Sequence, residues 1–233
     1  MIFVLSFRIR FPCYLYVMRE ILALWKRDIK NEWRNFYQLG GLLAFVSGVS
    51  YLIYFFSGSP DIREWNLLYW LTYLFLCFFI GSRTYEEDQT RYRLFVYQLV
   101  NPFNLFHSKW SFLFVFLTLL NILVLFLFTL FIPTIRVDFL QWILLSVFLN
   151  LGMSVLIAFS ALLNAHARNN TLFLTVLILP LSFPLIGMAF ATGLNILEGQ
   201  TIWSNLSKVQ LMLAIDLITC ALSFFIVPQL FRT

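Results

Sequence analysis

Charged residues are scarce in this sequence: only 12% of its 233 residues are Asp, Glu, Lys or Arg, whereas 61% are hydrophobic. Soluble domains carry about 25% charged and about 45–50% apolar residues. So few charges cannot cover a water-exposed surface, which excludes an ordinary soluble domain. The 28 Phe and 7 Trp are instead typical of a shell that faces lipid, with aromatic side chains at the membrane interfaces.

Cysteine and histidine are also few. The three cysteines, Cys13, Cys77 and Cys220, form no CxxC pair, no metal-binding spacing and no CxxCH haem-attachment motif. Two of them fall inside apolar runs, where we expect them to pack as small apolar groups. The two histidines, His107 and His166, lie in predicted loops outside the apolar runs. We therefore predict no metal site and no cofactor bound directly by this chain.

Catalytic motifs are missing as well. The sequence has no GxxxxGK[ST] phosphate loop, no HExxH, no GxSxG and no glycine-rich dinucleotide turn. An acidic trio, Glu86, Glu87 and Asp88, resembles a metal or acid–base site only superficially. Consecutive side chains on a helix diverge by about 100°, and no His or Cys nearby completes a ligand set. We predict a non-catalytic chain, in which the trio serves a helix N-terminus or a salt bridge to a partner.

Six apolar stretches are long enough, or nearly so, to cross the hydrocarbon core, which takes about 20 helical residues. The first two are short, and thinning of the bilayer or interfacial aromatic anchors would accommodate them. Helices are required because open strands leave backbone groups unpaired in lipid. We predict an all-α integral membrane protein with spans at 39–56, 65–82, 110–132, 139–163, 172–194 and 209–231.

Basic residues are divided unequally between the two sides of these spans. Six spans place both termini on one side, and that side would hold 13 of the 16 Lys and Arg residues. Because cytoplasmic loops carry the excess of Lys and Arg, we predict that both termini are cytoplasmic. The net charge of +5 then reflects contact with an anionic leaflet of the bilayer and requires no nucleic acid. The three basic residues predicted on the opposite side of the membrane are Arg63, Arg136 and Lys208.

Residues 19–37 have the pattern of an amphipathic helix that lies in the membrane interface. Trp25, Ile29 and Trp33 recur every four residues and form an apolar, aromatic face, while the basic residues lie largely elsewhere. The pattern supports surface anchoring directly, and a helix that relays motion into the first span is compatible with it. Residues 1–18 precede this helix as an extension, and a start at Met18, which would leave out residues 1–17, is an equally open interpretation.

The longest polar connection, 83–109, lies between the second and third predicted spans. After the acidic trio comes an apolar stretch that presents Phe95, Tyr97 and Leu99. Pro102 should end a short helix at or before the preceding residue. A minimal connection between two spans does not require such a helix. It is either a docking element for a cytoplasmic partner or a loop that lies on the membrane surface.

Asp216 is the only charged residue inside a predicted span. A proton or substrate relay, a hydrogen-bonded packing role and a position in an outer vestibule are all open. No basic residue lies at a similar depth, which favours packing, with Asn121 and Asn150 as candidate partners. Gly152 would permit the close helix approach that such packing needs.

Two prolines four residues apart, Pro180 and Pro184, interrupt the fifth predicted span. Each removes a backbone donor, so we predict a bend or a break in this helix. Neighbouring helices tolerate such a kink in a membrane bundle. A tolerated kink and a hinge that shapes a substrate path are therefore both open.

Four segments, taken in order, resemble the CcmB family, the membrane subunit of the cytochrome c maturation ABC transporter. They are 26–45, 93–110, 166–187 and 213–232, and the likeness extends over about 19–233. The residues that match the family pattern are Leu94, Tyr97, Leu99, Pro102, Ser108, Lys109, Asn169, Asn170, Pro180, Pro184 and Pro228. One departure is in the cytoplasmic loop, where Arg93 and Val96 replace a glycine and an acidic residue of many members.

The resemblance implies a permease of the type 2 ABC exporter class, with six spans in the bacterial inner membrane. A separate, CcmA-like ATP-binding subunit would supply the missing phosphate loop, and ATP would act through it. A CcmC-like haem-handling subunit and a haem chaperone would be further partners, because the tryptophan-rich haem motif of CcmC is absent here. Segment 86–109 would couple this chain to the ATPase through Glu86, Glu87, Asp88, Leu94, Phe95, Tyr97, Leu99, Pro102 and Lys109.

Haem, or a haem-loaded chaperone, is the substrate that the resemblance implies. Two alternatives are open. One is a type 2 ABC permease for a lipid, glycan or drug, and the other is a membrane scaffold that assembles partners without energised transport.

Overall fold

The computed structural model describes residues 3–58, 60–84, 101–133, 135–166 and 171–230. Within these ranges the chain is helical and contains no strand, so the all-α fold class is confirmed. The helices are α1 (Phe3–Arg34), α2 (Phe36–Ser57), α3 (Ile62–Arg83), α5 (Pro102–Phe131), α6 (Phe139–His166), α7 (Thr171–Leu197), the short 3-10 helix η2 (Ile202–Asn205) and α8 (Leu206–Leu230).

Five of the described helices are long and apolar enough to cross a membrane: 62–83, 103–131, 139–165, 176–197 and 202–227. A sixth apolar segment, Gly40–Phe56 within α2, is shorter. It corresponds to the first span predicted from the sequence, which was also among the two shortest. The chain is therefore a multi-pass membrane protein, with α2 as its shortest apolar segment.

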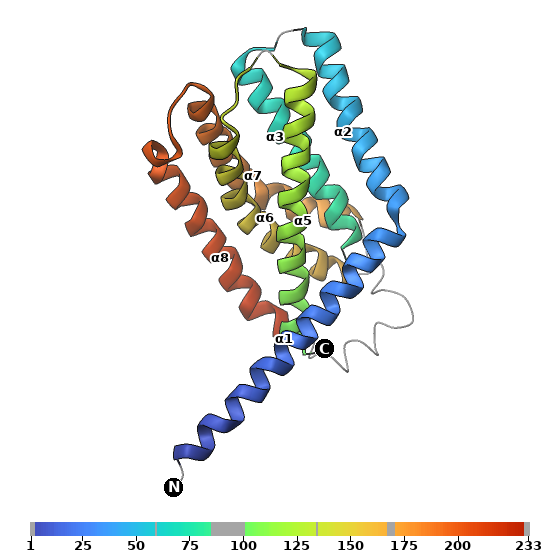
Figure 1. Ribbon diagram of the computed structural model, residues 1–233, viewed down its shortest axis with the longest axis vertical. Helices are drawn as coiled ribbons and strands as arrows, with labels where there is room; N and C mark the ends of the chain where they lie inside the picture. The colour runs from blue at the N-terminus through green and yellow to red at the C-terminus, as the bar shows by residue number, and fades with distance from the viewer. Residues whose placement is uncertain (1–2, 59, 85–100, 134, 167–170, 231–233) are drawn as a thin grey trace.

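The centre of the bundle is α6, which packs against α3, α5, α7 and α8 (Figure 1). Its middle turns, from Gly152 to Ala158, are buried without interruption. By contrast, α8 exposes a row of large apolar side chains, and α2 does the same on the opposite flank of the bundle. This arrangement suits lipid as the solvent, because apolar side chains need not be buried inside the protein when hydrocarbon surrounds it.

One continuous helix, α1, crosses the end of the bundle that lies near the C-terminus (Figure 1). The sequence predicted a helix over 19–37, but α1 begins at Phe3 and ends at Arg34. The extension before residue 19 is therefore helical from Phe3 onward and continuous with the predicted helix. A turn at Asn35 separates α1 from α2.

The polar connection predicted at 83–109 is shorter than expected, because α5 begins at Pro102. The side chain of Asn101 caps this helix by accepting a hydrogen bond from the backbone N–H of Phe103 at 3.2 Å. Proline is favoured at the first helical position, where its missing donor costs nothing. Residues 102–109 are therefore the first two turns of a 30-residue helix. This local start signal lies ahead of the apolar run that hydropathy detects.

The fifth span was predicted to bend or break at its two prolines, and the break is wrong. The helix α7 continues from Thr171 to Leu197 through Pro180 and Pro184. Both prolines are exposed, so their rings face away from the bundle core. Because the rings lie on the outer side of α7, they do not interfere with its packing against α3 and α6.

Two buried tyrosines of α3 connect it to α5 and α6. The Tyr69 hydroxyl donates to the side-chain oxygen of Asn121, and the Tyr73 hydroxyl donates to that of Asn150. Asn150 in turn donates to the Thr118 hydroxyl at 3.2 Å. Both asparagines, which the sequence suggested as partners of Asp216, are thus engaged with α3.

Replacing Tyr73 by Phe is expected to lower the free energy of unfolding by about 1–3 kcal/mol, because the buried Asn150 oxygen loses its donor. The matched control is Tyr51→Phe, since Tyr51 is 51% exposed on α2. Thermal unfolding in detergent measures both variants. Equal stability of the two would contradict the role given to the Tyr73 hydroxyl.

Candidate functional site

Polar contacts join the amphipathic helix α1 to the first turns of α5. We call these contacts the α1–α5 seam. All three link side chains more than 80 residues apart in the sequence. They are Lys109 Nζ to Asp28 Oδ1 at 3.1 Å, Trp25 Nε1 to Ser111 Oγ at 2.9 Å, and Asn104 Nδ2 to Glu20 Oε2 at 2.6 Å.

The central contact of the seam is a buried ion pair. The side chains of Asp28 and Lys109 are only 5% and 11% exposed. Arg27 lies beside them, with Nη2 at 3.2 Å from the same carboxylate oxygen. The second oxygen, Asp28 Oδ2, has no hydrogen-bond partner among the described residues. Two charges held this far from water need each other, because an unpaired buried charge costs several kcal/mol.

A second ion pair ties α1 to α3. Arg83 Nη2 lies 3.4 Å from Glu32 Oε2, and Arg83 is the last residue of α3. Thus α1 holds the end of α3 through one pair and the start of α5 through the other. The segment 85–100 runs between these two anchored ends.

The bundle-facing side of α1 differs from the apolar face that the sequence singled out. Leu24 and Asp28, one turn apart, are the buried positions among residues 18–34 of α1, the part whose side chains the structure describes. Ile29 and Trp33 are 51% and 76% exposed, and Trp25 is partly buried through its bond to α5. An exposed aromatic face is what anchoring in a membrane interface requires, so the two sides of α1 have separate roles.

Sequence reasoning missed Asp28. It lies in the run Lys26-Arg27-Asp28, where a lone acid among bases reads as a solvated surface charge. The available signal was its position four residues after Leu24, which puts it on a different face from Trp25, Ile29 and Trp33. Lys109 was assigned to ATPase coupling; the structure places it in the first turns of α5 against α1.

Most of the other coupling residues lie outside the described residues. Pro102 is described as the first residue of α5. The remaining residues assigned to coupling fall within 85–100, and these are Glu86, Glu87, Asp88, Leu94, Phe95, Tyr97 and Leu99.

Asp216 lies on α8, buried against Gly152 of α6. A Cβ atom at Gly152 would overlap the Asp216 carboxyl group, which confirms that this glycine permits the close approach of the two helices. The predicted hydrogen-bonding partners are wrong: neither oxygen of Asp216 has a partner in the described part of the chain. Asn121 and Asn150 face α3 instead.

In the ranges that the structure covers, no group of three or more His, Cys, Asp or Glu side chains lies together as a metal site would require. The interactions of α1 described above are electrostatic: the seam holds the start of α5 against α1, and the Arg83–Glu32 pair holds the end of α3.

These features define a multi-pass, all-α membrane protein whose N-terminal helix is bound across one end of the bundle. The family model described as CcmB protein matches residues 19–233, and the chain belongs to the CcmB family. CcmB proteins are haem-exporter subunits of the cytochrome c maturation transporter in the bacterial inner membrane. The family implies an ABC transporter complex with an ATPase and other Ccm components. Comparison with curated proteins and with solved structures found no match.

Proposed function

We propose that this chain is the non-catalytic permease subunit through which a separate, CcmA-like ATPase drives haem delivery for c-type cytochrome biogenesis. Haem itself, or a haem-loaded chaperone that is released, is the cargo, and a CcmC-like subunit hands it over. Membership of the CcmB family supports the process. The observation that carries the subunit's role is that α1 holds both helix ends flanking segment 85–100.

In this proposal, segment 86–109 is the surface that the ATPase contacts. When the ATPase displaces this segment, the end of α3 and the start of α5 are displaced with it. Because Arg83 is paired with Glu32 and Lys109 with Asp28, α1 moves together with both helices. The buried pair transmits force well, since charges in a low-dielectric site separate only at a high energetic cost.

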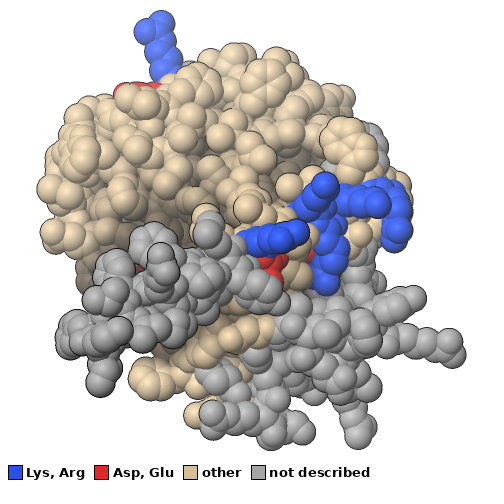
Figure 2. Space-filling model, turned by 60° about the horizontal axis from the view of Figure 1, so that its bottom comes forward, with Lys and Arg blue, Asp and Glu red and all other residues tan. Residues whose placement is uncertain are grey.

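The seam lies on the cytoplasmic side in this proposal, as an ATPase contact requires. Figure 2 shows basic side chains gathered on the end of the molecule that α1 crosses. Arg19, Lys26, Lys30 and Arg34 of α1 are all exposed. Such a basic helix suits the anionic cytoplasmic leaflet, with both chain termini in the cytoplasm.

A deletion strain tests the process. Without this chain, membranes stained for covalently bound haem should lack c-type cytochromes, and a plasmid copy should restore them. Intact c-type cytochromes in the deletion strain would overturn the proposal and favour a type 2 ABC permease for a lipid, glycan or drug.

A second experiment separates an energised permease from a scaffold. The ATPase should co-purify with this chain in mild detergent, and replacing Phe95, Tyr97 and Leu99 together by Ser should release it. An ATPase variant without its phosphate-loop lysine should still bind but fail to support cytochrome maturation. Normal maturation with that variant would favour a scaffold.

A further inference from the structure

Asp216 has an unusual environment for a carboxyl group. It lies near the middle of the apolar segment Ile202–Val227, and it is only 5% exposed. Neither of its carboxyl oxygens accepts a hydrogen bond from the described residues. Buried polar groups without a partner are rare in folded proteins, and an ionisable residue inside a membrane span is a functional-site hypothesis by default. What this carboxyl group can do depends on whether it carries a charge.

The helices packed on α8 offer Asp216 no counter-charge at its own level. These helices are α5, α6, α7 and η2. Neither α7 nor η2 contains a titratable side chain. The titratable residue of α6 is His166, at its last position, and those of α5 are His107 and Lys109, in its first two turns. All three therefore lie at helix ends, whereas Asp216 lies near the middle of α8.

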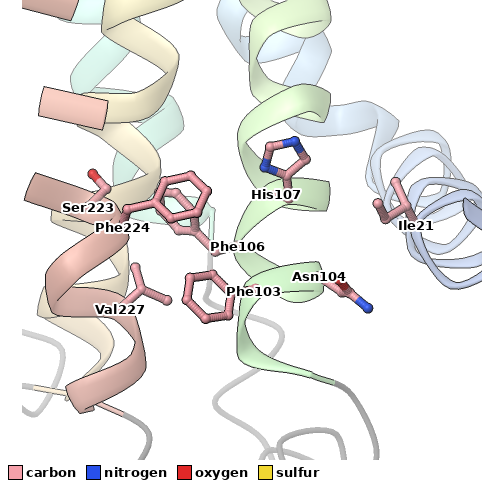
Figure 3. Close-up of a pocket in the computed structure, with 8 residues that line it drawn as sticks. All are labelled: Ile21, Phe103, Asn104, Phe106, His107, Ser223, Phe224 and Val227. Atoms are coloured by element: carbon pink, nitrogen blue, oxygen red, sulfur yellow. The ribbon is translucent and has the colours of Figure 1, made fainter. Parts of the chain in front are cut away.

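The other titratable residues of α8 are Cys220, one turn from Asp216, and Lys208, eight residues or about 12 Å away along the helix. Lys208 donates to a backbone carbonyl of α7 at 3.2 Å. In the other direction, Ser223 lies two turns from Asp216 and lines an open apolar pocket of about 270 Å³, across which lies His107 (Figure 3). The other lining residues are Ile21, Phe103, Asn104, Phe106, Phe224 and Val227. His107 is thus the titratable group with which Asp216 has to be compared.

The Asp216 carboxyl group lies directly on the backbone of α6. A Cβ atom built on Gly152 would overlap Oδ1 and Cγ of Asp216, so the carboxyl group fills the space that a side chain would take. The N–H groups of α6 are used in its helix, which is continuous here, whereas a helical carbonyl keeps a second lone pair. A carboxylate can only accept hydrogen bonds, but a neutral carboxylic acid can donate one. Only the neutral form can therefore bond to this surface.

We infer that Asp216 is a proton-binding site that controls the contact between α6 and α8. In the packed bundle it is a neutral carboxylic acid, and its O–H group donates to a backbone carbonyl of α6 beside Gly152. Without the proton, a carboxylate would be buried in an apolar region with no counter-charge, which is strongly unfavourable. Proton release therefore accompanies the movement of α8 away from α6, and proton uptake accompanies its return. This inference goes beyond the proposed function and does not rest on it.

Infrared spectroscopy of the purified full-length chain, in a maltoside detergent without carbonyl groups, tests the charge state. At about pH 8, carboxyl groups in contact with water are ionised. We expect the parent to keep the C=O band of one un-ionised carboxylic acid, which shifts in D₂O, and Asp216→Asn to lack this band. The controls Asp138→Asn, at an exposed acid, and His107→Gln should keep it. A parent without the band, or a band that persists in Asp216→Asn, would overturn the inference.

The pH dependence of unfolding tests the link between the proton and helix packing. Unfolding exposes Asp216 to water, where it ionises, so the folded chain binds one more proton than the unfolded chain at neutral pH. Above about pH 6, each added pH unit should then lower the folding equilibrium constant of the parent by up to about tenfold more than that of Asp216→Asn. Equal pH dependence of the two would contradict the link, because all other titrating groups are shared.

If Asp216→Asn does not fold, labelling of the parent with the apolar reagent dicyclohexylcarbodiimide replaces it. A neutral carboxylic acid adds to this reagent: its oxygen bonds to the central carbon, its proton passes to a nitrogen, and no group leaves. At about pH 8 in lipid nanodiscs, peptide mass spectrometry should find at least about tenfold more label on Asp216 than on Asp138, since an exposed carboxyl group is then ionised. Label on Asp216 at or below the level of Asp138 would overturn the inference.

Discussion

Replacing Lys109 by Met is expected to lower the free energy of unfolding by about 3–5 kcal/mol, because it leaves the Asp28 carboxylate buried without its main counter-charge. Both side chains are nearly inaccessible, so water cannot compensate for the lost partner. The same variant should fail to restore c-type cytochromes in the deletion strain. Thermal unfolding in detergent measures the first effect, and staining for covalent haem measures the second.

A control variant and a double variant test whether the effect of Lys109→Met comes from the buried ion pair. Lys30→Met is the matched control, since Lys30 is an exposed cation of α1, and it should change stability by less than about 0.5 kcal/mol. The double variant Asp28→Leu with Lys109→Met should regain most of the lost stability, because an apolar pair often replaces a buried ion pair without cost. If Lys109→Met were as stable as Lys30→Met, the seam would not hold a buried pair.

Replacing Gly152 by Val is expected to separate α6 from α8 and to destabilise the bundle by about 1–3 kcal/mol or more. The new Cβ would overlap the Asp216 carboxyl group, and both residues are buried where two helices of the bundle pack. The neighbouring turns of α6 are buried too, so the helix has little freedom to move aside. The midpoint of thermal unfolding in detergent measures the effect.

Gly187→Val provides the control for this substitution. It is also a glycine inside a long apolar helix, and a Cβ there would have no neighbour within 4 Å. Both variants carry the same cost of a β-branched residue in a helix, so their difference reports the overlap alone. Gly152→Ala combined with Asp216→Ala should be more stable than Gly152→Ala, because the overlap is removed. Equal losses for Gly152→Val and Gly187→Val would contradict the close approach.

Helix positions were predictable to the extent that hydropathy marks them. The predicted spans overlap α2, α3, α5, α6, α7 and α8, because the length of an apolar run is itself the property that lipid selects. Their ends were less predictable. The start of α5 is set by Asn101 and Pro102, and this capping signal lies outside the apolar window that defined the span.

The candidate site was predictable only in part. The aromatic repeat of Trp25, Ile29 and Trp33 marks an amphipathic helix, but the repeat could not show which side of it meets the bundle. That side carries the buried residues Leu24 and Asp28, and Asp28 is paired with Lys109 of α5. Similarly, Asn121 and Asn150 were plausible partners for any buried polar group, and the tyrosines of α3 rather than Asp216 lie within reach of them.

The sequence by itself determined that the chain is an all-α, multi-pass membrane protein, and its ordered segments indicated the CcmB family. The preference of the helices for lipid over water follows from the composition and from the length of the apolar runs. Neither property depends on how the helices are placed relative to one another. Only the tertiary structure decided that Asp28 meets Lys109, that Asp216 packs on Gly152 and that residues of α1, α5 and α8 line one open apolar pocket. Such contacts join residues far apart in the chain, and the relative placement of the helices, not any local pattern, brings them together.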